Sequence, residues 1–201
     1  LIKCVIRDRQ EQEKLLDALN HYPVVAKMAA WAEKWMNPSI PYRFRLVAFI
    51  CYEAILFSDK FAAIFWMRDR NLLEAVGHAN LLIAKDEGSH EQFGIHQHGL
   101  LKHKCTPDEI AGIVKEAVTL DEEFIRAITP EGMINMNVDM MLNYTKIVAN
   151  RVLSNLCGKT SKVPFQYDVT FDDKICSIMD KLGLMQMTSF FEKRGSNYNS
   201  M

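Results

Sequence analysis

The chain has 201 residues, of which 49% are apolar, and this composition suits one compact domain with a sizeable core. The 24 basic and 25 acidic residues are well mixed and leave a formal net charge of −1, so neither nucleic acid nor a membrane surface is an expected partner. No apolar run has the length of a transmembrane helix, and the five dispersed cysteines lack a C-x-x-C pair, which predicts reduced thiols in a cytoplasmic protein.

Glycine and proline are scarce and separate long segments with helical periodicity, so the fold is predicted to be all-α. In chain order, the expected helices cover residues 8–20, 23–36, 42–70, 71–104, 106–128 and 137–156. A capping box from Thr106 to Glu109 starts the fifth helix, and Gly158 is the expected C-cap of the sixth. The four long helices predict an antiparallel bundle, with a helical core over 1–158 and an extension over 159–201 that ends in a mobile tail.

Two apolar stripes on neighbouring helices carry ionisable side chains. The first contains Glu53 as its only polar member, among residues at steps of three or four: Leu46, Ile50, Phe57, Phe61 and Ile64. The second places three ionisable groups on one face with apolar residues: Ala79, Ile83, Asp86, Glu87, His90 and Phe93. We expect both faces to point into the core. Because an unpaired buried carboxylate is very costly, these positions require a metal or a tight polar network.

The spacing Glu87-x-x-His90 brings a carboxylate and an imidazole together on one helix face, close enough to bind one or two metal ions. The alternative is a core histidine that hydrogen-bonds to a buried acid. Glu53 on the preceding helix favours the metal, because mixed carboxylate and imidazole ligands suit non-haem iron or manganese.

Other clusters have plainer interpretations. A zinc site at His96, His98 and His103 is disfavoured, since the first two lie on different helix faces, and a solvated face is expected instead. Two further groups are interpreted as core packing, one aromatic and one of methionines: Phe57, Phe61, Phe65, Trp66, Met133, Met136, Met140 and Met141.

Several segments resemble the small, radical-generating subunit of class I ribonucleotide reductase, in its eukaryotic or large-DNA-virus form. The resemblance spans almost the whole chain. Its segments are 30–35 (AWAEKW), 47–58 (VAFICYEAILFS), 61–66 (FAAIFW), 85–90 (KDEGSH) and 190–194 (FFEKR), with Tyr198 six residues after Glu192.

The resemblance implies a ferritin-like helical bundle that here lacks the N-terminal helices of the family. It implies that Glu53, Glu87 and His90 are three of six protein ligands to two iron ions per complete subunit, with manganese as an alternative metal. Asp86 then orients a histidine ligand and takes part in radical transfer. A complete subunit is expected to form a homodimer.

The same resemblance assigns roles to residues away from the metal. Phe57, Phe61 and Ile83 match the apolar pocket around the radical, which excludes water. Glu192 and Tyr198 match the tail that carries the radical to the large subunit, where ribonucleotides are reduced to deoxyribonucleotides for DNA replication.

Part of the family's metal site has no counterpart in this chain. The remaining ligands and the radical tyrosine lie upstream of the first residue, so this chain alone is expected to be inactive unless another polypeptide supplies them. Two alternatives stay open: a ferritin-like di-iron oxidase that acts on its own substrate, and a degenerate helical module without catalysis.

Overall fold

The computed structural model describes residues 2–68, 70–72, 74–129, 137–158 and 163–171. Helices are the only regular secondary structure in these ranges, which confirms the predicted all-α class. Their bounds are α1 Ile2–Val5, α2 Arg9–Leu16, α3 Ala18–His21, α4 Pro23–Met36, α5 Tyr42–Cys51, the π-helix η1 Tyr52–Leu56, α6 Phe57–Arg68, α7 Glu74–Leu100, α8 Pro107–Ile128 and α9 Val138–Cys157.

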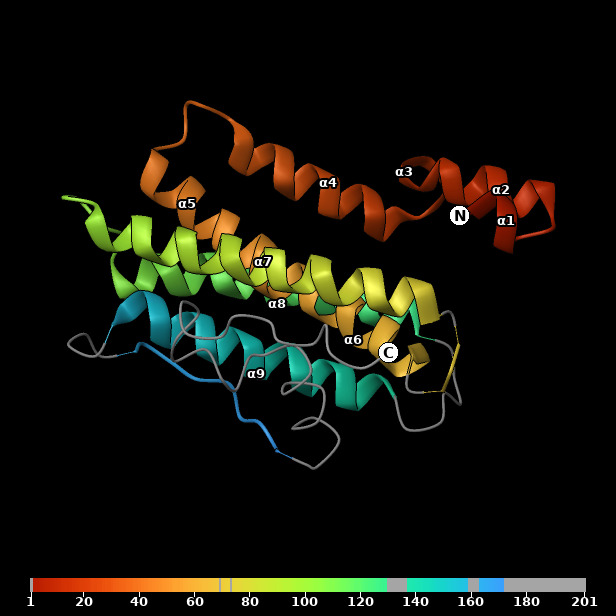
Figure 1. The fold of residues 1–201 in the computed structure, drawn as a ribbon. Helices are drawn as coiled ribbons and strands as arrows, with labels where there is room; N and C mark the ends of the chain where they lie inside the picture. The colour runs from red at the N-terminus through yellow and green to blue at the C-terminus, as the bar shows by residue number, and fades with distance from the viewer. Residues whose placement is uncertain (1, 69, 73, 130–136, 159–162, 172–201) are drawn as a thin grey trace.

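Four long rods form the body of the fold: α5–η1–α6, α7, α8 and α9 (Figure 1). Successive rods run in opposite directions, as the pattern of long periodic segments predicts. The capping box is present, because the hydroxyl oxygen of Thr106 accepts from the backbone N–H of Glu109 at 3.2 Å and the Glu109 carboxylate accepts from the N–H of Thr106 at 2.7 Å. Gly158 ends α9 with a φ of +70°, a conformation that favours glycine.

The rod from 42 to 70 is not the uninterrupted α-helix that the sequence predicts. A turn of π-helix, Tyr52–Leu56, lies at its centre and contains Glu53. A π turn inserts an extra residue, so the inward face shifts along the sequence: Leu46 and Ile50 are buried before it, whereas Ala62 and Phe65 are buried after it. Phe57, Phe61 and Ile64 are consequently only half-buried.

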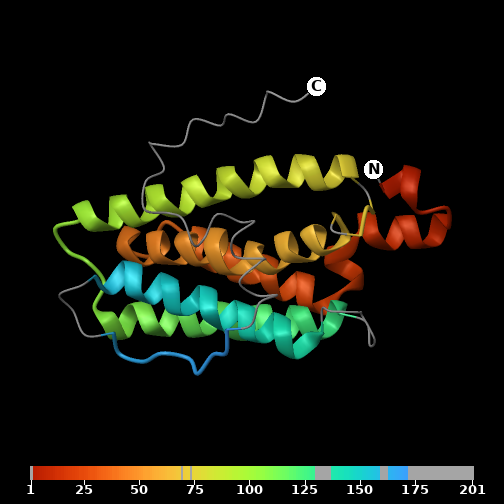
Figure 2. The same cartoon turned by 60° about the horizontal axis from the view of Figure 1, so that its bottom comes forward.

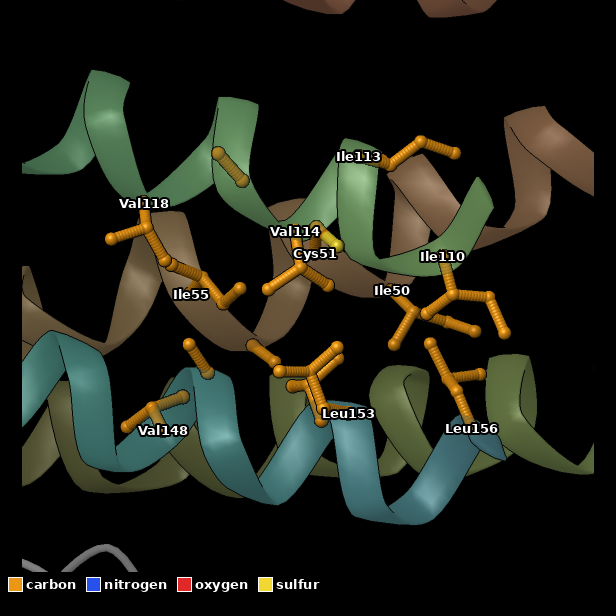
Figure 3. Close-up of a cluster of buried hydrophobic side chains, with 14 of the residues drawn as sticks. Ile50, Cys51, Ile55, Ile110, Ile113, Val114, Val118, Val148, Leu153 and Leu156 are labelled. Carbon is orange, nitrogen blue, oxygen red and sulfur yellow. The ribbon is translucent and has the colours of Figure 1, made fainter. Parts of the chain in front are cut away.

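The core lies between α5, η1, α8 and α9, where aliphatic side chains from all four interdigitate (Figure 3). Val47, Ile55, Val114 and Leu153 are completely or almost completely inaccessible to solvent. The rod that contains Glu53 is therefore anchored by the α5 and η1 side chains that belong to this core.

The rod α7 lies against α5 through small residues. Figure 2 shows α7 along one side of the bundle, next to α5 and α6. Its buried positions include Gly77, Ala84 and Gly94, and a Cβ built on Gly94 would lie 2.6 Å from Cγ1 of Ile50. Only glycine permits this approach, which sets the distance between the helices that carry the ionisable residues.

Residues 163–171 follow α9 as an extended segment. The side chain of Asn143 bonds both backbone groups of Thr170, with distances of 2.6 Å and 3.0 Å. Two turns further along α9, Asn150 does the same for Tyr167, at 3.0 Å and 2.8 Å. The segment also packs Phe165 against the core cluster.

No helix in the described part of the chain is both long and apolar enough to cross a membrane. The described cysteines, Cys4, Cys51, Cys105 and Cys157, are free thiols.

Gly94→Ala should destabilise the chain by about 1–3 kcal/mol, because the added methyl group overpacks against Ile50. Gly99→Ala is the matched control on the same helix, since a Cβ at this position would have nothing within 4 Å, and it should be neutral or slightly stabilising. Urea unfolding of both variants measures the difference, and equal stabilities would contradict the close approach.

Candidate metal centre

Glu53, Glu87 and His90 converge at one point between η1 and α7. One ligand atom from each residue can be chosen so that all three lie within 4.8 Å of one another. Nδ1 of His90 is 2.8 Å from Oε2 of Glu87 and 3.6 Å from Oε2 of Glu53. Two separate helices therefore place two carboxylates and an imidazole together.

Local structure explains this convergence. Glu87 and His90 lie three residues apart on α7, so their side chains project from one face. Glu53 belongs to the π turn, whose extra residue turns its side chain toward α7 and away from the aliphatic core. The Glu53 side chain is 11% exposed and Oε2 has no hydrogen-bond partner among the described residues.

The three groups are electrostatically coupled. Burial raises the pKa of Glu53 to about 8, and the neighbouring Glu87 carboxyl adds to this rise. The hydrogen bond from Glu53 lowers the pKa of Glu87, with a further contribution from His90. The bond to Glu87 raises the pKa of His90. In the absence of a cation, a proton on Glu53 thus reduces the repulsion between the Glu53 and Glu87 carboxyl groups.

These residues fit a metal ion. A buried carboxylate oxygen without a partner is expensive unless a cation or donor meets it, and Oε2 of Glu53 is such an atom among the described residues. The donor set of two carboxylates and one imidazole suits iron or manganese.

The expectation that the whole second stripe points into the core is wrong. The side chains of Asp86 and His90 are 72% and 47% exposed, and Ile83 and Phe93 are 50% and 61% exposed. The buried face of α7 consists of other residues: Gly77, Asn80, Ala84, Glu91, Gly94 and His98. The converging groups therefore lie at the edge of the bundle, with Glu53 innermost.

The other predicted residues are distributed around this centre. Oδ2 of Asp86 is 3.9 Å from Nε2 of His90, on the opposite side of the ring from Glu87. Phe57 and Phe61 have ring centroids 6.2 Å apart, and Phe61 lines a small cavity together with Glu53. Ile83 does not line that cavity.

Some predicted residues lie elsewhere. Glu192 and Tyr198 are outside the described residues, as are Met133 and Met136. His98 is 3% exposed, so the expected solvated face is wrong for this histidine, although His96 and His103 are exposed.

Sequence reasoning missed two buried ionic clusters. In the first, Nζ of Lys60 is 2.6 Å from Asp59 and 2.7 Å from Asp121, and Asp121 also accepts from the hydroxyl of Thr145 at 2.7 Å. Burial and the charge of Asp121 raise the pKa of Asp59 to about 7. In the sequence, the position of Asp121 among the apolar residues of α8 could have indicated a buried carboxylate that needs a partner.

The second cluster is an ion pair between α7 and α9. Nη2 of Arg151 donates to Oε2 of Glu91 at 2.8 Å, and the Glu91 side chain is 2% exposed. Burial raises the pKa of Glu91 and the guanidinium opposes this shift. Glu91 lies one helical turn after Glu87, on the same side of α7. This spacing could have indicated that Glu91 is also buried and needs a cationic partner.

A helical bundle whose neighbouring rods place two glutamates and a histidine together has the architecture of the di-metal carboxylate proteins. Comparison with known proteins defines the family within that class. Residues 1–160 match the family model described as "Ribonucleotide reductase, small chain", and the chain belongs to this family.

Several relatives support this membership. The chain is 37% identical over 203 residues to the ribonucleoside-diphosphate reductase small chain of vaccinia virus (strain Ankara), covering 100% of this chain and 60% of the viral one. It is 36% identical over 199 residues to a ribonucleoside-diphosphate reductase small chain of Arabidopsis thaliana, covering 98% of this chain and 57% of the plant one. This chain therefore spans about 60% of the length of these relatives.

A solved structure agrees with the fold. The Rnr4 homodimer from Saccharomyces cerevisiae, a ribonucleotide reductase structure, is similar with a TM-score of 0.63 and 28% identity, over 77% of this chain and 51% of the yeast chain. The predicted ferritin-like bundle is thereby confirmed.

Manganese(II) affinity should rise as the pH approaches about 8, because Glu53 must lose its proton before it binds a cation. Glu53→Gln cannot ionise, so its affinity should be lower by at least about tenfold, with a weaker pH dependence. His96→Ala, an exposed histidine on α7, is the control. The electron paramagnetic resonance signal of free manganese measures binding, and equal affinity at all pH values would contradict this assignment.

Asp59→Asn should remove part of the pH dependence of stability. The pKa of Asp59 is raised from 3.8 to about 7, so its favourable contribution is complete below pH 3.8 and is lost as the pH rises from there through about 7. The free energy of unfolding of the variant should therefore rise relative to that of the original chain by up to about 4 kcal/mol across that interval, with no further rise above it. Urea unfolding at several pH values measures this gain, and a constant difference would exclude it.

Proposed function

We propose that this chain is the C-terminal portion of a ribonucleoside-diphosphate reductase small subunit, which supplies a tyrosyl radical to the large subunit for the reduction of ribonucleotides. The convergence of Glu53, Glu87 and His90 carries this proposal, together with membership of the small chain family. The ligand roles follow from the chemistry of these side chains and from the resemblance.

In this proposal, Glu53, Glu87 and His90 hold the metal, which supplies the oxidising chemistry when it is bound. Two irons, or manganese in their place, would occupy a complete site. Asp86 faces the outer nitrogen of His90 at 3.9 Å and orients the ring. Phe57 and Phe61 exclude water on the η1–α6 side, since their rings pack at 6.2 Å.

The remaining ligands would approach from the exposed side of α7. His90 is half-exposed there and Ile83 lies two turns earlier on the same face, so this side of the centre is accessible to additional protein. With three of the six ligands that the resemblance implies, the chain would hold half a site and would require further polypeptide for radical formation. Ile83 would join the water-excluding pocket once such a segment covers it.

Glu192 and Tyr198 are proposed to relay the radical to the large subunit, with Tyr198 as an oxidisable side chain in the tail. The complete subunit is proposed to act as a homodimer in the cytoplasm. The similar yeast structure is that of a homodimer, which supports the first of these assignments.

A degenerate module without catalysis is the second candidate. The observation that favours it is the limited ligand set, since Glu53, Glu87 and His90 form the one group of potential metal ligands among the described residues. A self-contained oxidase is less favoured, because it has no need of a relay tail.

Expressed with any coding sequence that precedes Leu1, the protein should bind two irons per subunit and show a tyrosyl radical in electron paramagnetic resonance after exposure to oxygen. Iron uptake without a radical would favour the oxidase. Absence of iron uptake would favour the degenerate module.

Tyr198→Phe in that longer protein should leave the radical signal unchanged and abolish ribonucleotide reduction with the large subunit, because phenylalanine cannot be oxidised in the relay. Tyr167→Phe is the control, since this tyrosine packs against the core through the extended segment. Reduction at an unchanged rate in Tyr198→Phe would remove the relay assignment.

A further inference from the structure

The ion pair between Glu91 and Arg151 lies directly behind the candidate metal centre. Glu91 follows His90 in the chain and lies one helical turn after Glu87. Its carboxylate accepts from Arg151 at 2.8 Å, with side-chain exposures of 2% for Glu91 and 18% for Arg151. A buried pair with this geometry fixes α7 relative to α9.

One cavity joins the pair to the centre. Its volume is about 30 Å³. It is lined by the carboxylates Glu53, Glu87 and Glu91, by Arg151 and by apolar and small residues that include Ser58. Oε2 of Glu53 and Oε1 of Glu91 are both buried without a hydrogen-bond partner among the described residues. Three carboxylates therefore surround one small space, with the guanidinium of Arg151 in its wall.

We propose that Glu91 and Arg151 are positioning residues of the metal centre: their ion pair holds α7 at the rotation and height that bring Glu87 and His90 to Glu53. This inference rests on the proposed metal-binding function. Neither residue ligates the metal.

The physical reason is that the other contacts hold α7 mainly against α5, η1 and α6, whereas the ion pair ties it to α9. The face of α7 that carries His90 is exposed, so no packing within the described part of the chain fixes the helix from that side. The close contact at Gly94 fixes the distance to α5, one turn beyond His90. The ion pair adds a directional constraint at Glu91 itself, because a guanidinium donates along fixed directions.

The decisive variant replaces both partners, Glu91→Leu with Arg151→Met. Removal of one partner alone leaves a buried charge uncompensated and destabilises the fold, whereas replacement of both by apolar side chains of similar size is often neutral. The double variant should keep its unfolding midpoint in urea and lose about 10- to 100-fold in manganese(II) affinity, as is typical when a partner that orients a ligand is removed.

A matched control removes another ion pair between α9 and a neighbouring helix. Nζ of Lys146 is 3.2 Å from Oε1 of Glu122 on α8, and neither residue lines the cavity. Glu122→Leu with Lys146→Met should keep the original manganese affinity. An equal loss in this control would show a general effect of ion-pair removal and would overturn the proposal.

A second measurement needs no metal. The nitrogen-15 chemical shift of His90 Nδ1 reports the 2.8 Å hydrogen bond to Glu87, and it should change in the Glu91/Arg151 variant and not in the control. If the folded double variant binds manganese as tightly as the original chain, with an unchanged His90 shift, the positioning role is excluded. If the original chain itself fails to bind manganese, the metal-binding function fails instead, and the His90 shift alone decides whether the pair positions α7.

Discussion

The constraint on which this structure depends is the burial of carboxylates inside a helical bundle. Glu53, Asp59, Glu91 and Asp121 all have side chains exposed by no more than 11%. Each must meet a cation or share a proton, because an isolated buried charge is very costly. Lysine and arginine satisfy three of them, whereas Glu53 meets Glu87 and His90 within the described part of the chain. The carboxylate without a permanent cation of its own thus belongs to the group proposed to hold a metal.

The fold and the converging triad could be predicted from the sequence because both depend on local regularities. Helical periodicity located the rods, Thr106 and Glu109 set one helix start, and spacing placed Glu87 with His90. The π turn at Glu53 could not be predicted, since hydrophobic periodicity assumes a constant residue count per turn. The stripe it interrupts is therefore buried in its first half and only half-buried in its second.

The buried face of α7 was predicted incorrectly for a related reason. Hydrophobic periodicity gives weight to large apolar residues such as Ile83 and Phe93, which are exposed. The buried face instead uses Gly77, Ala84 and Gly94, because helices that approach closely need small residues at the contact. Partners distant in the sequence, such as Arg151 for Glu91, carry no local signal at all.

The two asparagines of α9 show how a helix can bind an extended chain without a sheet edge. Asn143 and Asn150 are seven residues apart, a rise of about 10.5 Å, and their backbone partners Thr170 and Tyr167 are three residues apart, about 10 Å when extended. The spacing of the two asparagines on the helix thus matches the spacing of their partners on the extended segment. Each side-chain amide bonds the backbone N–H and C=O of one residue, as a neighbouring strand would. A single insertion or deletion between Tyr167 and Thr170 would change this spacing, so Tyr167 and Thr170 could no longer meet both asparagines at once. The register of the segment is therefore set by the matched spacing of the two pairs.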